Sequence, residues 1–298
     1  MVSALQDSLG PEETRVPQPV RDMQARARRM TTPCGDGHMV WHQWGAAGGA
    51  AAPVVLLHGG SGSWTHWLRN IEALVATGRQ VWAPDLPGFG ASDGVPGGQD
   101  ADTMPEPLHQ GLRWLLGSRE FDLVGFSFGG MTAGLLAARF SAGVRRLVVV
   151  GAPAMWLRDE RPVRLLGWRH LDSAAARMDA HRHNLQALML HDAQAIDDDT
   201  LALHVQNVLR DRLPRRRLSQ TDALAQALRR VACPVHAIYG MHDMLYQGRH
   251  AELELAFSRA APQFAGLHWV EGAGHWVQYE QPARFDAVLQ GCLDAPLT

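Results

Sequence analysis

Short apolar runs recur along the chain, and longer stretches that mix apolar and polar residues separate them. These runs predict strands at residues 53–57, 80–83, 121–124, 144–150, 235–239 and 266–270. The mixed stretches predict helices near residues 64–76, 104–116, 131–139, 248–260 and 282–293. Strands that alternate with helices in this way are typical of a mostly parallel, twisted sheet with helices on both faces. The predicted fold class is therefore α/β.

The N-terminal region departs from this alternation. Residues 30–32 and 39–44 flank the turn Gly35-Asp36-Gly37 and predict a hairpin. With the hairpin, the sheet has about eight strands. Residues 1–25 are polar and contain three prolines, Pro11, Pro17 and Pro19, so they predict a flexible N-terminal arm.

The alternation also stops between residues 154 and 232, where no buried-strand run occurs. Residues 173–190 and 200–209 read as helices there. A helical insertion between two strands predicts a cap over the carboxyl edge of the sheet, where sites of α/β proteins lie. The predicted domains are a core of residues 26–153 and 233–298 and a helical cap of residues 154–232.

Composition narrows the function classes. The 298 residues are 46% hydrophobic and 19% charged, with a net charge of -2, which is typical of an ordinary protein that binds neither nucleic acid nor membrane. All 28 basic residues are arginine, so Schiff-base chemistry on lysine is excluded. Three scattered cysteines and no apolar leader segment predict a reducing, cytoplasmic location without disulfides.

Gly125-Phe126-Ser127-Phe128-Gly129 joins a predicted strand to a predicted helix. A sharp strand-to-helix turn with serine at its apex is a nucleophile elbow. Glycines two residues before and after the apex remove side chains that would collide with a strained backbone. The turn would expose the Ser127 hydroxyl and direct the Phe128 amide to the same place, where a helix N-terminus favours a negative oxygen.

The motifs His58-Gly59-Gly60, Asp85–Asp93, Gly125–Gly130, Tyr239–Asp243 and Gly272–Trp276 follow one another in an order that resembles the α/β-hydrolase family over roughly residues 30–295. The resemblance implies Ser127 as nucleophile, His275 as general base and Asp243 as the acid that orients the histidine. The family sometimes places the acid one strand earlier. Residues 151–154 contain no carboxylate, so we expect Asp243 to serve.

The same resemblance implies that the amides of Gly60 and Phe128 form the oxyanion hole. Such a set of groups needs neither a metal ion nor an organic cofactor. The sequence contains no HExxH or CxxC motif, so no metal site is predicted. The run Arg215-Arg216-Arg217 reads as a solvated face of the cap.

The reaction is less narrowly defined. The stretch His275-Trp276-Val277-Gln278-Tyr279-Glu280 resembles meta-cleavage-product hydrolases, which break a C–C bond in dienoates. Those enzymes usually have asparagine where this chain has Phe126, and a cap arginine where alignment by eye puts His204. Both departures remove groups that would bind an acidic dienoate.

A pocket lined by Phe126, Trp64, Trp276 and His204 would suit a neutral carboxylic ester, with Trp67 as a further apolar wall. We therefore expect a serine hydrolase that acts on a small-molecule ester, with a C–C hydrolase as the alternative. A ligand-binding sensor with a vestigial triad is a third interpretation, from another class. The oligomeric state stays open, with a homodimer as one alternative.

Overall fold

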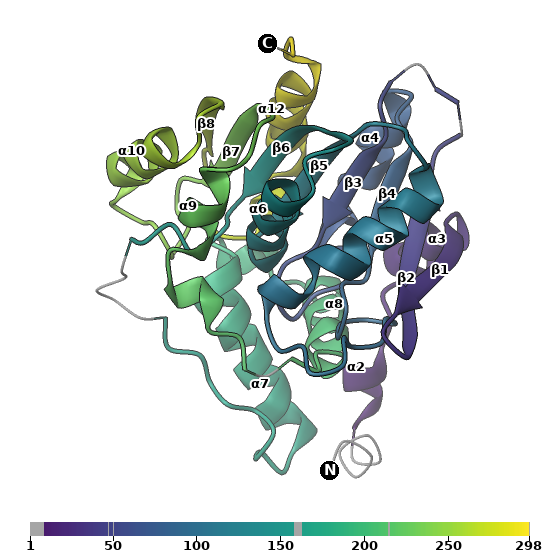
Figure 1. Cartoon of the computed structure of the whole chain (residues 1–298). Coiled ribbons are helices and arrows are strands. Elements are labelled where there is room, and N and C mark those ends of the chain that lie inside the picture. Colours follow the sequence, from purple (N-terminus) through teal and green to yellow (C-terminus); the bar gives the residue numbers. More distant parts are fainter. Residues whose placement is uncertain (1–8, 47, 50, 158–162, 214, 298) are drawn as a thin grey trace.

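The computed structural model describes residues 9–46, 48–49, 51–157, 163–213 and 215–297 (Figure 1). Its eight strands form one sheet in the order β1-β2-β4-β3-β5-β6-β7-β8. The strands are β1 (Arg28–Cys34), β2 (Gly37–Trp44), β3 (Val54–Leu57), β4 (Val81–Pro84), β5 (Phe121–Phe126), β6 (Val144–Val150), β7 (Val235–Gly240) and β8 (Phe264–Val270). The predicted α/β fold with a mostly parallel sheet is confirmed.

The order of the strands determines where a ligand can bind. β2 pairs antiparallel with β1 and β4, whereas β4, β3, β5, β6, β7 and β8 all pair in parallel. The chain passes from β3 to β4 on one side and then to β5 on the other side of β3. The carboxyl ends of β3 and β5 therefore flank the switch point of the sheet, where open α/β sheets place their ligands.

Helices cover both faces of the sheet (Figure 1). One face carries α5 (Pro105–Leu116), α6 (Phe128–Arg139) and α10 (His250–Ala260), and the other carries α4 (Ile71–Ala76) and α12 (Pro282–Asp294). The predicted helix at 64–76 is divided into a 3₁₀ turn, η1 (Trp64–Trp67), and α4. The buried Asn70 between them donates to the Gln278 carbonyl, which holds the chain at this break. Among the described helices, none is long and apolar enough to cross a membrane.

Between β6 and β7 the described residues form helices joined by loops, and none of them is in a strand. This segment contains the 3₁₀ turns η4 (Ala193–Ala195) and η5 (Leu218–Gln220) and two longer helices, α7 (Ala174–Asn184) and α8 (Asp198–Leu209). Helix α7 continues into a π-helical turn, η3 (Leu185–Met189). Two side chains cap the long helices, because Ser173 accepts from the Ala176 amide and Asp197 accepts from the Thr200 amide. The expected helices at 173–190 and 200–209 are therefore present.

One predicted limit of the cap needs correction. Helix α9 (Ala223–Leu228) lies inside the predicted cap of residues 154–232 but packs on α6 at the sheet. A Cβ on Gly134 of α6 would come within 2.4 Å of Leu224 Cδ1, so the two helices are in close contact. Because α9 has only six residues, its sequence does not tell a sheet helix from a cap helix.

The prediction of a flexible arm is wrong for the described part of residues 1–25; residues 1–8 lie outside it. The chain forms α2 (Pro11–Thr14) and α3 (Gln18–Ala25). Val20 and Met23 are buried in the core, and the Trp44 indole donates to the Met23 carbonyl. Glu13 is 1% exposed and pairs with Arg177 of α7. Prolines begin these helices rather than preventing them, because a proline is well tolerated in the first turn.

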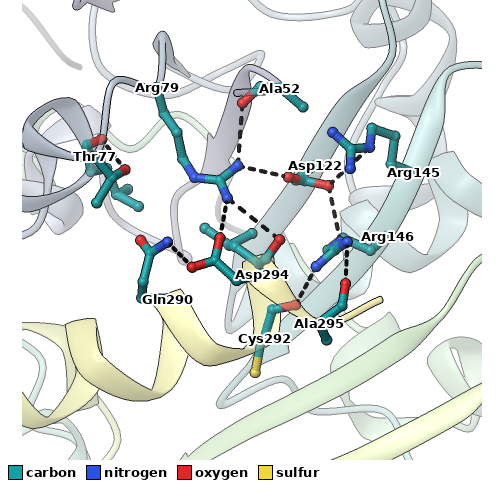
Figure 2. A network of polar contacts seen from close by, with 12 residues as sticks. Ala52, Thr77, Arg79, Asp122, Arg145, Arg146, Gln290, Cys292, Asp294 and Ala295 are labelled. Carbon is teal, nitrogen blue, oxygen red and sulfur yellow. Dashed lines mark hydrogen bonds and ion pairs between the residues drawn. The ribbon is translucent and has the colours of Figure 1, made fainter. Parts of the chain in front are cut away.

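A buried ion network fixes the C-terminal helix to the amino end of the sheet (Figure 2). Asp122, near the start of β5, is 0% exposed and accepts from Arg79 at 3.1 Å. Arg146 Nε lies 3.2 Å from the same carboxylate, and its Nη1 donates to the Cys292 carbonyl on α12. Arg79 also binds Asp294 at the end of α12. Each buried charge thus has a counter-charge, without which its burial would be costly.

Candidate functional site

Ser127 lies at the apex of the turn between β5 and α6, with φ 51° and ψ -116°. This positive φ is rare for a residue with a side chain and indicates a strained backbone. Strain of this kind persists only where the surroundings enforce it. Here the Ser127 amide donates to the Val150 carbonyl of the neighbouring strand at 2.7 Å, which holds the apex in place.

The two flanking glycines are required by close approach. A Cβ on Gly125 would lie 2.3 Å from the Gly129 carbonyl oxygen, and a Cβ on Gly129 would lie 2.4 Å from the His58 carbonyl oxygen. Neither position has room for a side chain. The glycine spacing noted in the sequence is therefore explained by packing of the elbow against its own helix and against the loop after β3.

The structure brings Ser127, His275 and Asp243 together. His275 Nε2 lies 2.9 Å from Ser127 Oγ. On the other side of the ring, Nδ1 lies 3.1 and 3.0 Å from the two oxygens of Asp243. His275 and Asp243 are 2% and 1% exposed. Three residues that are far apart in the sequence thus form one hydrogen-bonded chain that ends at an apex hydroxyl.

Neighbouring loops hold the acid and the base in place. A Cβ on Gly240 would lie 2.1 Å from the Gly274 carbonyl oxygen, so the loops that follow β7 and β8 touch. The hydroxyls of Tyr239 and Tyr246 both donate to the Ala152 carbonyl, which ties the end of β7 and the loop after it to the residues that follow β6. The positions of Asp243 and His275 are therefore set by backbone contacts at the sheet edge.

The glutamate of the predicted stretch 275–280 has a structural role. The Glu280 carboxylate accepts from the amide of Gly274 beside the candidate base. It also accepts from the amides of His191 and Asp192, which follow the π-helical turn of the insertion. In addition, the Trp276 amide donates to the Met189 carbonyl at 2.7 Å. The insertion is thus fastened directly to the loop that carries His275.

The candidate oxyanion donors meet at the switch point of the sheet. Phe128 is the first residue of α6, and first-turn amides have no acceptor inside their own helix. Gly60 follows β3, and a Cβ added to it would lie 3.6 Å from Phe128 Cβ. Both residues line the same cavity as Ser127 and His275. The geometry thus allows two backbone amides to serve one oxygen bound at Ser127.

A cavity of about 800 Å³ opens over Ser127. Its apolar wall is formed by residues of the insertion and of the sheet edge, Phe126, Phe128, Pro153, Ala154, Met155, Trp156, Leu157, Val163, Leu165, Leu188, Met189 and Leu245. Trp156 and Leu165 are 59% and 52% exposed, so the rim of the cavity is apolar as well. The cavity is large enough for a drug-sized ligand.

Only one of the four predicted substrate contacts lines this cavity in the described part of the chain, namely Phe126. Trp276 is 0% exposed and donates its indole N–H to the His66 carbonyl. Trp64 lines a separate cavity of about 150 Å³ near α3. The expectation that these two tryptophans form the substrate pocket is wrong, because both pack behind it in the core.

His204 does not line the cavity either. It faces His181 of α7, with ring centroids 5.7 Å apart, in the interior of the insertion. Burial and the neighbouring His181 lower the pKa of His204 to about 3, so its ring is neutral and has no charge to offer an acidic substrate. The expectation from the alignment by eye, that His204 contacts the substrate, is therefore wrong, and no described residue of α8 lines the cavity.

Arg216 is a further residue of the site, although its sequence context predicts a solvated run. Arg215 and Arg217 are exposed, but Arg216 lines the cavity. Its Nη1 donates to Asp211 at 2.7 Å, and its Nη2 donates to Ser61 Oγ at 3.2 Å. The acidic residue five positions earlier was a weak signal, whereas Ser61 is too distant in sequence to be noticed.

The family model described as alpha/beta hydrolase fold matches residues 52–282. The chain belongs to the α/β-hydrolase fold family. The matched range spans the sheet from β3 onward, the insertion and all three members of the hydrogen-bonded chain.

The chain is also similar to curated enzymes. It is 28% identical over 270 residues to a 2-hydroxy-6-oxononadienedioate/2-hydroxy-6-oxononatrienedioate hydrolase of Paraburkholderia xenovorans. The aligned region covers 86% of this chain and 91% of that protein. It is 29% identical over 255 residues to a 2-hydroxymuconate semialdehyde hydrolase of a Pseudomonas species. Here the aligned region covers 81% of this chain and 86% of that protein.

Among solved structures, the fold is similar to a carboxylesterase of Bacillus subtilis, with a TM-score of 0.76, 18% identity and 98% of each chain covered. It is also similar to a meta-cleavage product hydrolase, with a TM-score of 0.69 and 23% identity over 87% of this chain and 96% of that one. At such identities these structures support the fold alone.

Proposed function

We propose that the protein is a serine hydrolase that cleaves a neutral small-molecule carboxylic ester through an acyl-enzyme. The observation that carries the proposal is the chain of contacts from Asp243 through His275 to Ser127, which ends in a large apolar cavity. A hydroxyl bound to a positioned imidazole is the arrangement that nucleophilic acyl transfer requires.

In the first half of the proposed reaction, Ser127 Oγ attacks the ester carbonyl while His275 Nε2 takes its proton. Asp243 accepts from Nδ1–H, selects that tautomer and stabilises the imidazolium that forms. The tetrahedral oxygen receives hydrogen bonds from the amides of Phe128 and Gly60. His275 then gives its proton to the leaving alcohol, and an acyl-Ser127 remains.

In the second half, water enters the space vacated by the alcohol. His275 takes a proton from it, and the hydroxide adds to the acyl carbon. Collapse of the second tetrahedral intermediate returns the proton to Ser127 Oγ and releases the acid. Because the strained apex is held by the Val150 carbonyl, Ser127 keeps its position in every step, so little reorganisation is needed.

The lining of the cavity favours a neutral substrate. Phe126 directly precedes the nucleophile and offers no hydrogen bond, and neither the indole of Trp276 nor the ring of His204 reaches the cavity. An acidic dienoate buried there would find no donor at Phe126 or His204, and the cavity-lining Arg216 is already paired with Asp211. Unpaired buried charge is costly. The exposed apolar rim at Trp156 and Leu165 would instead bind the alkyl or aryl part of an ester.

A second candidate function is C–C hydrolysis of a meta-cleavage product. It is favoured by Arg216, a cation in the cavity wall, and by the names of the curated relatives described above. Against it, Arg216 is already paired with Asp211, so a substrate carboxylate would have to compete for it.

A substrate panel tests the proposal. Purified protein would be given p-nitrophenyl esters of increasing chain length and a phenyl dienoate, with Ser127→Ala and the cavity-lining Ser219→Ala as a matched pair. We expect ester turnover and fluorophosphonate labelling in the wild type and in Ser219→Ala, and neither in Ser127→Ala. A strong preference for the dienoate would support C–C hydrolysis. Binding without any turnover would support the ligand-binding interpretation.

A further inference from the structure

A second group of reactive side chains lies where the last two strands meet the C-terminal helix. His236 is on β7, His268 is on β8 and Cys292 is on α12. One ring nitrogen of each histidine and the Cys292 sulfur all lie within 4.8 Å of one another. None of these residues lines the cavity over Ser127, so the group is independent of the proposed hydrolysis.

The strand register explains why the two histidines meet. His236 pairs with Gly266, and two residues farther along Ile238 pairs with His268. Residues two apart on a strand share a face, so both histidines lie on the same face as Ile238. That face packs under α12, because Ile238 and Cys292 belong to one core cluster. Sheet geometry and helix packing together thus bring two imidazoles and one thiol to one place.

Two nitrogens in this group have no partner among the described residues. His236 is 6% exposed, and its Nδ1 is buried without a hydrogen bond; His268 Nε2 is in the same state. Buried polar atoms in folded proteins are nearly always paired. Two orphaned nitrogens beside a buried sulfur are better explained by a ligand that binds all three than by packing alone.

Room for such a ligand exists beside His268. Gly266 has φ 137°, and a Cβ built on it would meet only one atom within 4 Å, His268 Nε2 at 3.7 Å. The strand thus leaves a space at the position opposite His236. His268 is only partly buried on the edge strand β8, which gives an ion a route from solvent.

We propose that His236, His268 and Cys292 form a binding site for a zinc-class divalent cation. Imidazole and thiolate are the ligands that zinc prefers in proteins, and a set of three leaves a fourth position for water. Ideal zinc bonds would bring the ligand atoms to about 3.4–3.6 Å apart, which requires small rotations of the side chains. On binding, the Cys292 S–H bond breaks, the sulfur keeps the electron pair, and the proton goes to solvent.

Arg146 is the nearby cation that could oppose this site. Figure 2 shows that Arg146 faces the Cys292 carbonyl, to which it donates, while the sulfur of Cys292 lies on the other side of the residue. Arg146 is also paired with the buried Asp122. Its charge is therefore compensated, and the sulfur is left facing the two histidines.

The experiment uses the full chain, freed of metal with a chelator and titrated with Zn²⁺ and, separately, Co²⁺. We expect one high-affinity equivalent of Zn²⁺, a raised melting temperature, and a thiolate-to-metal charge-transfer band with Co²⁺. Cys292→Ser and His268→Gln should each weaken binding by at least about a hundredfold, since even outer-shell changes cost about 10–100-fold.

Controls separate this site from adventitious binding. Cys34→Ser/Cys233→Ser leaves Cys292 as the one remaining cysteine of the sequence and should keep the cobalt–thiolate band, even if Cys292→Ser does not fold. His109→Gln, on a helix remote from β8, should bind as the wild type does. Zinc binding that survives His268→Gln unchanged, or a cobalt complex without a thiolate band, would overturn the proposal.

Discussion

The guanidinium carbon of Arg216 lies 3.6 Å from the point where a Cβ on Gly60 would be. The insertion therefore contributes a cation next to a candidate oxyanion donor. Ser61 links the pair to Asp211, since its hydroxyl donates to that carboxylate at 2.6 Å. The cation is neutralised before any substrate binds, which makes Asp211 and Arg216 one electrostatic unit.

This unit predicts a rescue experiment. Arg216→Ala would leave the Asp211 charge alone near the oxygen that becomes negative, and we expect kcat for a neutral ester to fall about 10–100-fold, equivalent to about 1.4–2.7 kcal/mol. Adding Asp211→Asn should recover most of that loss. The exposed Arg215→Ala is the control. Steady-state kinetics on the wild type, Arg216→Ala, Asp211→Asn and the double variant gives the coupling energy, and additive effects would show that the pair does not act near the reacting carbonyl.

The contact between His275 and Asp243 predicts a specific defect in Asp243→Asn. The amide can donate to Nδ1, so the ring would adopt the wrong tautomer and Nε2 would no longer accept the Ser127 proton. We expect kcat to fall about 10³–10⁴-fold with little change in KM. Asp36→Asn, on the exposed hairpin turn, should be neutral. Near wild-type kcat in Asp243→Asn would mean that another carboxylate orients the base.

The Glu13–Arg177 pair predicts an acid-sensitive contact between the N-terminal helices and the insertion. The hydrogen bond from Arg177, and less strongly that from the Gly10 amide, holds the pKa of Glu13 below its usual value of 4.5. Because the folded-state pKa is lowered, the stabilisation is complete above about pH 4.5 and is lost as the pH falls through the lowered value.

Hydrogen exchange of residues 11–25 measures this effect. Protection should decrease below pH 4.5, and Glu13→Gln should show weakened protection already at pH 7, by about 1–3 kcal/mol of local opening energy. The exposed Glu12→Gln is the matched control. Equal protection in both variants at pH 7 would show that the hydrophobic contacts of Val20 and Met23 alone hold the segment.

Two carboxylates in the buried network of Figure 2 bind the same arginine, Arg79. We predict that their substitution lowers the free energy of unfolding by very different amounts. Asp122 is 0% exposed, so Asp122→Asn would leave buried arginine charge uncompensated and should cost about 3–5 kcal/mol of unfolding free energy. The Asp294 side chain is 58% exposed, so Asp294→Asn should cost less than about 1 kcal/mol. Urea denaturation checks both, and similar losses would contradict the dominance of burial.

The sheet and the elbow could be predicted because their signals are local. The apolar runs of β3 and β6 require burial on both faces, and the glycines around Ser127 are imposed by contacts within a few residues of it. His275 and Asp243 were also accessible, since each follows a recognisable strand at the edge where sites lie. These features depend on residue type and spacing, both of which the sequence displays.

The walls of the cavity could not be predicted in the same way. Whether Arg216 or His204 faces Ser127 depends on how the insertion lies on the sheet, and that is decided by contacts between residues more than a hundred positions apart. Trp64 and Trp276 are of a residue type that often lines apolar pockets, but in this structure both are packed in the core. The packing of the N-terminal helices could not be predicted from their own residues. It depends on the ion pair of Glu13 with Arg177, which lies 164 positions away in the insertion.

Glu280 has a consequence for exchanging parts between members of the family. Its carboxylate binds one amide beside His275 and two amides of the insertion, so it connects the insertion directly to the loop of the base. A foreign insertion grafted between β6 and β7 would have to present two backbone amides at the same place. Without them, the Glu280 carboxylate next to the base would lose two of its hydrogen bonds. A graft intended to change the substrate preference would then lower kcat instead.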